Sequence, residues 1–495
     1  MQGHFQSFKR SVVERIEEEI DIFTAQWTDN GVNGDTKEDV KSKAKENNVE
    51  LFATYPATRS LYHFFCAIFF LLVSGTLYED IVRDGWPDLS FELLWWNFGR
   101  LDVTMLVWAA MVLSTLLLLY PATYQWFHLR RSVDSHAFRR LVDALALAAY
   151  LAYLASMFYL PVRAIMVLEL PCACSFIVSC EQIRLLMKVH AFVREATKKA
   201  AAIARNPTET AAEVDQGQDC ALGKMEHFIY FLFAPTLLYR DSYPRSPTRD
   251  WTRVVKHFFE CLLTILYTYY VIQRLCIPAY KNLDYRNTSL LTFVHNASSA
   301  VFAGGLLLVL LFYGLLHCWM NMFAEMLRFG DRRFYSEWWN SKSMANYYRD
   351  WNWIVHEWLF EYLYKELALL LPKSLLPTVG TCCIFFVSAF FHEYIFALAY
   401  RFVYPVIFVL YFGFGTVFFF VSRLTPFPRF WNVVMFWNLG TGQGMFVAFY
   451  FMEYYARQTC PSPLGSSSEP WYAPLIDITP RSWYCDSADS VPELQ

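Results

Sequence analysis

A histidine and a glutamate, His392 and Glu393, stand side by side in the apolar stretch FFVSAFFHEYIFALAY at residues 385–400. An ionisable group at that depth in a membrane costs roughly 3 kcal/mol, so its presence indicates a functional site. Histidine can remove a proton from an alcohol near neutral pH. Ser388, one helical turn earlier, shares its face. The alternative interpretation is that His392 is a polar group hydrogen-bonded between packed helices. Glu393 lies on another face of the helix and is assigned no role.

A second stretch with side chains suited to catalysis or binding is FYSEWWNSKSMANYYRDWNWIVHEWLFEYLYKEL at residues 334–366. Asn340 and Asn352 supply amide donors, and Arg349 and Lys365 could meet phosphates from the cytosolic side. An aromatic belt at the membrane interface would explain many of the tryptophans. It does not explain two Trp-Asn pairs.

The composition of the chain favours one polytopic, all-α membrane protein over a set of soluble domains. Its 495 residues are 56% hydrophobic and 19% aromatic but only 18% charged, which soluble domains rarely combine. About nine membrane-spanning helices are expected within a unit at 59–455. We place them near 61–78, 102–124, 141–160, 163–183, 256–277, 291–318, 376–399, 401–421 and 432–453.

The two ends of the chain are polar and are expected to lie outside this unit. Residues 1–58 contain a flexible stretch and, at 13–27, a short run with the periodicity of a helix seam. That run is interpreted either as an oligomerisation helix or as an amphipathic helix on the membrane. The other end is a tail at 456–495.

Lys and Arg indicate the orientation in the membrane. The intervals 125–140, 184–255 and 319–375 contain four, eleven and seven of them, whereas 79–101, 278–290 and the tail contain two each. The positive-inside rule puts the basic intervals and the N-terminus in the cytosol and the tail on the opposite side. Cys460 and Cys485 lie in that tail, where a disulfide would suit an oxidising lumen.

Several common catalytic motifs are missing from the sequence. There is no Walker A loop, GxSxG or HExxH motif, and the cysteines have no zinc-ligand spacing. We therefore expect no metal, no cofactor and no nucleic-acid partner.

At these residues the chain resembles the membrane-bound O-acyltransferase family, and within it the sterol O-acyltransferase branch. FYSEWWN is similar to the family's FYxDWWN signature, RDWNWIVHEWL to the stretch with its catalytic Asn, and SAFFHEY to that with its catalytic His. Further matches in order along the chain are FLFAPTLLYRDSYPR, FAEMLRFGDR, MEYYARQTCP and PRSWYC. Glu337 departs from the Asp usual in sterol enzymes, and the diacylglycerol branch has Glu there.

The resemblance implies a fold enclosing a reaction chamber in the endoplasmic reticulum membrane, in a homodimer or homotetramer. Acyl-CoA enters from the cytosol, and a sterol such as cholesterol arrives from the bilayer and is esterified at its 3-hydroxyl for storage. His392 is then the general base, and Asn352 with Trp351 its catalytic companion. Less directly matched positions line the acyl-CoA channel, namely Asn346, Tyr348, Arg349, Tyr364 and Ser388.

Three alternatives to a sterol O-acyltransferase stay open at this point. One is a diacylglycerol O-acyltransferase, favoured by Glu337 but not by the tail motifs. Another is a proton-coupled transporter, against which the lack of an inverted repeat counts. The third is an inactive sterol sensor, against which the presence of both Asn352 and His392 counts.

Overall fold

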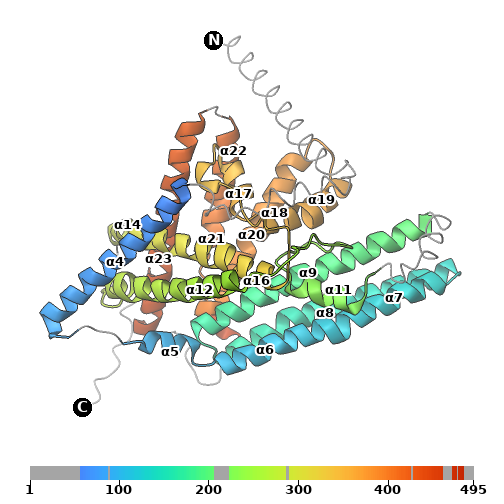
Figure 1. Ribbon diagram of the computed structural model, residues 1–495, viewed down its shortest axis with the longest axis horizontal. Coiled ribbons are helices and arrows are strands. Elements are labelled where there is room, and N and C mark those ends of the chain that lie inside the picture. Colours follow the sequence, from blue (N-terminus) through green and yellow to red (C-terminus); the bar gives the residue numbers. More distant parts are fainter. Residues whose placement is uncertain are drawn as a thin grey trace, which may run out of the picture.

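The structure, a computed structural model, describes residues 56–86, 90–205, 222–285, 289–424, 427–460, 471–476 and 478–483. Within these ranges it contains helices and no strands, with one isolated β-bridge between Arg245 and Phe329. The helices form an elongated body with long helices along one side and steeply crossing helices along the other (Figure 1). The run at 13–27 lies outside the described residues.

The first part of the chain forms the long helices. They are α4 (Pro56–Asp84), α5 (Glu92–Phe98), α6 (Leu101–Ser114), η1 (Thr115–Leu119), α7 (Tyr120–Ser132), α8 (His136–Val167) and α9 (Cys172–Arg205). In Figure 1, α6 to α9 run together along one side of the molecule.

The middle part packs against both ends of the chain. It consists of α11 (Met225–Phe233), α12 (Trp251–Val271), η2 (Ile272–Cys276), α13 (Ile277–Tyr280), α14 (Leu290–Ser299), α15 (Val301–Leu311), η4 (Phe312–Trp319) and α16 (Met320–Met326). Of these, α12 packs against η4 and α16, whereas α14 and α15 pack along the C-terminal helix α23.

The last part contains the candidate site. Its elements are η5 (Trp338–Asn340), α17 (Met344–Trp351), α18 (Trp353–Leu359), η6 (Phe360–Tyr364), α19 (Lys365–Leu370), α20 (Leu376–Tyr400), α21 (Val406–Phe408), η7 (Val409–Gly415), α22 (Thr416–Leu424), α23 (Pro428–Thr459) and α24 (Ala473–Ile476). In Figure 1, α17 to α19 lie beside α20 and α22, and α17 packs against α22 and α19 against α20.

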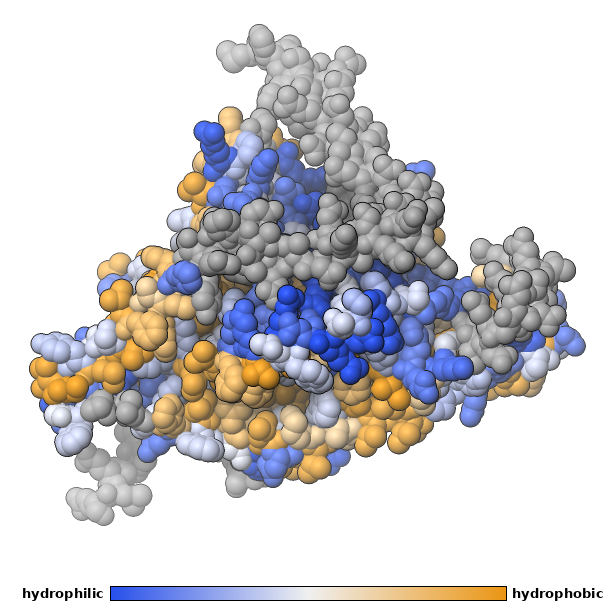
Figure 2. Space-filling view, in the orientation of Figure 1, coloured by the Kyte–Doolittle hydropathy of each residue, from blue (hydrophilic) through white to orange (hydrophobic). Residues whose placement is uncertain are grey.

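Each of the nine apolar segments predicted from the sequence overlaps one or more helices. Six helices or helix runs in the described residues are long and apolar enough to cross a membrane. The full count of nine stays a prediction. In Figure 2, hydrophobic residues spread over much of the lower part of the face shown, while hydrophilic residues gather near its centre.

Three predicted boundaries need correction. The break placed at 160–163 lies instead at 168–171, because Pro161 is accommodated inside α8 and the chain turns at Glu169, whose φ is 49°. The segment beginning at 163 becomes α9, which continues to Arg205. The helix expected from 401 begins at Val406, because Arg401 has φ 62° and ends α20.

Close contact of α14 and α15 with α23 depends on glycines. A Cβ on Gly304 would lie 2.6 Å from the backbone carbonyl of Gln443, and one on Gly444 would lie 2.6 Å from the Ala297 oxygen. Small residues at such positions let membrane helices approach closely and pack through van der Waals contact. The neighbouring Gly305 has open space where its Cβ would be.

We expect Gly304→Ala to destabilise the protein, because its methyl group must push α23 away. Overpacking of this kind costs about 1–3 kcal/mol. The measurement is the thermal unfolding temperature of the purified protein in detergent. Gly305→Ala is the matched control: the same change on the same helix should leave the unfolding temperature unchanged or raise it, because alanine favours helix over glycine. Equal effects of the two changes would contradict this account of the helix contact.

Candidate functional site

His392 lies on α20 with its ring held in a defined orientation. Its Nδ1 lies 2.7 Å from the Ser388 carbonyl oxygen, which can only accept, so Nδ1 carries the proton and donates. Nε2 of the neutral ring is then left as the acceptor nitrogen. The side chain is exposed within the isolated chain, and its ring centroid lies 5.1 Å from that of Tyr411 on η7. This arrangement suits a general base.

Ser388 contributes to this geometry through its backbone carbonyl. The sequence pointed to Ser388 because it shares a helical face with His392. That pattern does not show whether the hydroxyl or the carbonyl of Ser388 makes the contact. Its side chain is partly buried on α20. The contact with His392 is therefore independent of the serine hydroxyl.

Glu393 faces away from His392 and is built into the packing. Its two carboxylate oxygens accept from the Tyr450 hydroxyl at 2.5 Å and the Phe408 backbone N–H at 3.1 Å. The side chain is 7% exposed, so these donors offset the cost of burying it. Glu393 thus fixes α20 against α23 and α21.

Asn352 occupies the junction between α17 and α18. Its backbone is non-helical, with φ −142° and ψ 89°, and its Oδ1 accepts from the Val355 N–H at 3.2 Å. This N-cap bond identifies which side of the amide is oxygen, because the Val355 N–H requires an acceptor. The Nδ2 group is therefore turned the other way, as a donor.

The backbone on both sides of Asn352 is held by residues 334–336, which we call the Tyr335 segment. The Ser336 N–H donates to the Asp350 carbonyl at 2.8 Å, and the Trp353 N–H donates to the Phe334 carbonyl at 2.9 Å. These two bonds bracket the junction. The FYSEWWN motif and the Trp-Asn pair, separate in sequence, are thus one structural unit.

Trp351 packs into an aromatic cluster under the junction. Its ring centroid lies 4.9 Å from that of Trp338 and 5.0 Å from that of Phe312. On the other side, the Arg333 guanidinium lies 3.6 Å from the ring centroid of Trp353. These contacts restrict the junction from both sides, and Trp351 acts on Asn352 through packing.

The helix η7 contacts both Tyr348 of α17 and His392 of α20. Tyr348 of α17 has its ring 4.9 Å from Phe385 of α20, and its hydroxyl lies 2.9 Å from where a Cβ on Gly415 would be. Gly415 ends η7, and Tyr411 of the same helix faces His392. The structure therefore brings Tyr348 to the helix that also faces His392.

The other residues expected along an acyl-CoA channel lie farther from His392 or are engaged locally. Tyr364 packs at Gly380, twelve positions before His392 on α20, or about 18 Å along the helix axis. Arg349 forms a two-point ion pair with Asp350, with nitrogen–oxygen distances of 2.9 and 3.2 Å. The backbone N–H of Asn346 donates to Ser343, the N-cap of α17.

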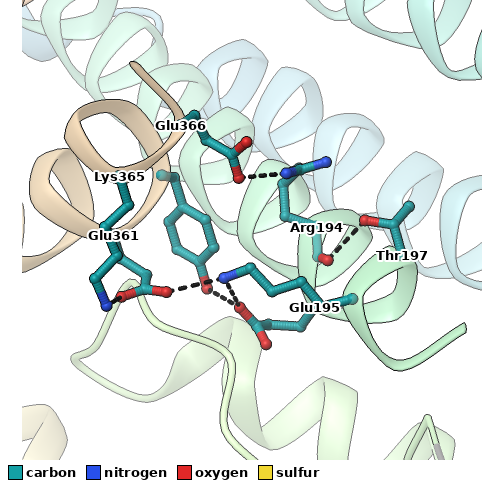
Figure 3. Close-up of polar contacts among 8 residues, drawn as sticks. Arg194, Glu195, Thr197, Glu361, Lys365 and Glu366 are labelled. Atoms are coloured by element: carbon teal, nitrogen blue, oxygen red, sulfur yellow. Dashed lines mark hydrogen bonds and ion pairs between the residues drawn. The ribbon is translucent and has the colours of Figure 1, made fainter. Parts of the chain in front are cut away.

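A charged network that the sequence did not reveal joins α9 to η6 and α19 (Figure 3). Arg194 pairs with Glu366, and Lys365 donates to Glu361 at 2.7 Å. Lys198 bridges Glu195 and Glu361, with 2.9 Å to each. Lys365, expected to meet phosphates, is thus already paired with a carboxylate. The network holds the site-bearing segment against α9, a contact between residues more than 160 positions apart.

His356 is a second histidine close to Asn352 that was not singled out from the sequence. It follows Asn352 by one helical turn, and its backbone N–H donates to the Asn352 backbone carbonyl at 3.1 Å. Burial lowers the pKa of its imidazole to about 4, with nearby Arg349 acting in the same direction. The ring is therefore neutral in the folded protein at physiological pH.

Comparison with known proteins finds a matching family model and similar proteins. The family model for MBOAT, the membrane-bound O-acyltransferase family, matches residues 89–452. Sterol O-acyltransferase 1 of Rattus norvegicus is 38% identical over 429 residues, covering 86% of this chain and 75% of that protein. Sterol O-acyltransferase 2 of Homo sapiens is 37% identical over 427 residues, covering 86% and 77%.

The depressed pKa of His356 predicts a loss of stability in mild acid. The unfolded chain takes up this proton below its ordinary value of 6.5, whereas the folded chain resists it until about 4. Stability is therefore lost as the pH falls through this window. We expect the unfolding temperature of His356→Gln to depend less steeply on pH than that of the wild type between about pH 7 and pH 5. His136→Gln, at an exposed histidine, is the control and should keep the wild-type slope.

Proposed function

The chain belongs to the membrane-bound O-acyltransferase family, and we propose that it transfers a long-chain fatty acyl group from acyl-CoA to the 3-hydroxyl of cholesterol. Membership of the sterol branch is supported by 37–38% identity to sterol O-acyltransferases over 86% of the chain. The single structural observation behind the mechanism is the proton on Nδ1 of His392, which leaves Nε2 as a base.

In this mechanism the sterol hydroxyl attacks the thioester carbonyl carbon while His392 Nε2 takes the hydroxyl proton. The carbonyl oxygen becomes an oxyanion, to which the Nδ2 amide of Asn352 donates. Collapse of the intermediate breaks the carbon–sulfur bond, and the protonated His392 returns the proton to the CoA thiolate. The products are a sterol ester and CoA, and His392 is neutral again.

The structure supports Asn352 as a pre-oriented donor. Its oxygen is used by the Val355 N–H and its flanking backbone by the Tyr335 segment, so the amide need not reorganise during the reaction. Trp351 acts as a positioning residue beneath it. The transfer requires no metal or cofactor, since acyl-CoA is a co-substrate.

We assign the remaining matched residues to acyl-CoA. Tyr348 and Ser388, near η7 and His392, are assigned to the thioester end. Tyr364, at the far end of α20, and Arg349 and Asn346 on α17 are assigned to the CoA side. Arg349 would have to exchange Asp350 for a phosphate, which its planar guanidinium can bind at two points.

Glu337 is accommodated within its own turn, which weakens the case for the diacylglycerol branch. Its Oε2 accepts from the Nδ2 group of Asn340 at 2.9 Å. The contact needs a carboxylate on this loop and does not reach the helices that bear His392 and Asn352. The named relatives likewise favour the sterol branch.

We further propose an endoplasmic reticulum location, a cytosolic N-terminus and a lumenal tail, in a homodimer or homotetramer. The charge distribution supports the orientation. Cys460 is buried after α23 and takes part in a disulfide, while nine other described cysteines have free thiols. Cys485, outside the described residues, is the proposed partner because it lies in the same tail.

The two catalytic roles are tested by three variants. His392→Ala should lower turnover by at least about 10², the lower range for a general base. Asn352→Asp keeps an oxygen for the N-cap but removes the donor, so it should lower turnover by about 10² to 10³ without lowering the unfolding temperature. Asn352→Ala separates the two effects, since it should also lose about 1 kcal/mol of stability. Near-normal turnover of a folded His392→Ala or Asn352→Asp protein would refute the corresponding role.

Substrate choice is tested by release of free CoA from oleoyl-CoA by the purified protein in detergent. We expect fast release with cholesterol and far less with diacylglycerol, with His392→Ala as the background in both cases. Faster release with diacylglycerol would overturn the sterol assignment and leave the two catalytic roles in place.

Labelling of cysteines with an impermeant maleimide tests the tail. In opened vesicles, Cys460 and Cys485 should label only after reduction. Labelling of either without reduction would contradict the proposed pair.

A further inference from the structure

A cluster of metal-ligating side chains lies between α12 and η4, apart from the residues assigned to acyl transfer. His257 and Glu260 come from α12 and Cys318 from η4, and one ligand atom from each lies within 4.8 Å of the others. His257 is 1% exposed and Cys318 is 0% exposed. A sequence search for zinc spacing misses this cluster, because the ligands come from two helices 58 residues apart.

The three side chains converge on one atom. The His257 Nδ1 lies 2.9 Å from Glu260 Oε2, and the Cys318 Sγ lies 3.6 Å from the same oxygen. Cys261, next to Glu260 on α12, donates to the Gly314 carbonyl of η4 at 3.7 Å, so a second sulfur lies between the same two helices. Nitrogen, oxygen and sulfur donors thus surround a common point.

The charge on Glu260 also calls for a cation. Its side chain is only 12% exposed, and a buried carboxylate is costly unless it is paired. Its charged neighbour Lys256 lies at 3.9 Å and its side chain is 58% exposed, so this pair offsets little of the cost. The carboxylate therefore depends on the His257 imidazole at 2.9 Å and on any cation bound between them.

We propose that His257, Glu260 and Cys318 bind a zinc ion. Zinc takes imidazole, carboxylate and thiolate ligands together, usually in a tetrahedral set of four. Magnesium and calcium prefer oxygen ligands, which makes a thiol and an imidazole a poor site for them. The Cys261 thiol, one residue from Glu260, is a candidate for the fourth position.

The ion would be structural. It would connect α12 to η4 at the cytosolic end of the two helices, where the neighbouring residue His317 bonds to the Tyr335 hydroxyl at 2.7 Å. Tyr335 lies in the segment whose backbone brackets Asn352. The cluster is therefore linked through His317 and Tyr335 to the segment that holds Asn352, the proposed oxyanion donor. It takes no part in the chemical steps.

The test is the metal content of the full-length protein, purified in detergent with any polyhistidine tag removed. We expect about one zinc per chain by elemental analysis, as for a closed structural site. His257→Gln and Cys318→Ser should each lower that content severalfold. Cys66→Ser, at a partly buried thiol on α4, is the matched control and should keep it.

Cobalt provides a second readout that does not depend on activity or on the metal acquired during expression. After removal of bound metal, Co²⁺ alone should give a sulfur-to-cobalt charge-transfer band that is absent in Cys318→Ser and present in Cys66→Ser. A folded protein that contains no zinc and gives no such band would overturn the proposal. So would stoichiometric zinc retained in both His257→Gln and Cys318→Ser.

Discussion

Polar groups within the apolar interior of this protein must find partners in the chain itself, because the bilayer offers them none. Lys188 shows the constraint clearly: it is 1% exposed, and its ammonium donates to the carbonyls of Phe231, Leu232 and Ala234 at 2.5, 2.9 and 2.8 Å. Those carbonyls are at the end of α11, where a helix leaves acceptors unused. This one buried side chain therefore joins α9 to the end of α11, which is distant in sequence. It determines how these two helices pack.

The same constraint connects the C-terminal tail to the helix that bears His392. Glu453 of α23 is fully buried and accepts from the backbone N–H groups of Arg481 and Ser482, each at 3.0 Å. The Trp483 indole donates to the Tyr404 hydroxyl at 3.0 Å, and the Tyr404 carbonyl accepts from Tyr450, the residue that also bonds Glu393. The tail residues Arg481, Ser482 and Trp483 are thus linked through their partners to Glu393 and help to hold α20 in place.

The two proposed reactive groups use only one of their two polar atoms in a bond that orients them. His392 donates from Nδ1 within its own helix and Asn352 accepts a helix-cap bond at Oδ1, and in the proposed mechanism His392 Nε2 and the Asn352 Nδ2 group meet the substrate. In each case, one of the two polar atoms of the group makes a bond that orients the side chain. The other polar atom is costly to bury without a partner, so it must face a space that water or a substrate can reach.

The sequence by itself determined the helical membrane class and the approximate positions of the apolar segments, and it supplied the proposal that His392 and Asn352 are catalytic, because these follow from composition and from short contiguous motifs. It could not place the breaks at Glu169 and Arg401, where single backbone angles decide the end of a helix. Only the tertiary structure showed that the Tyr335 segment brackets Asn352, that Tyr348 and His392 share η7, and that His257, Glu260 and Cys318 meet. Each of these depends on contacts between residues distant in sequence, which are decided by the packing of whole helices and leave no local pattern in the chain.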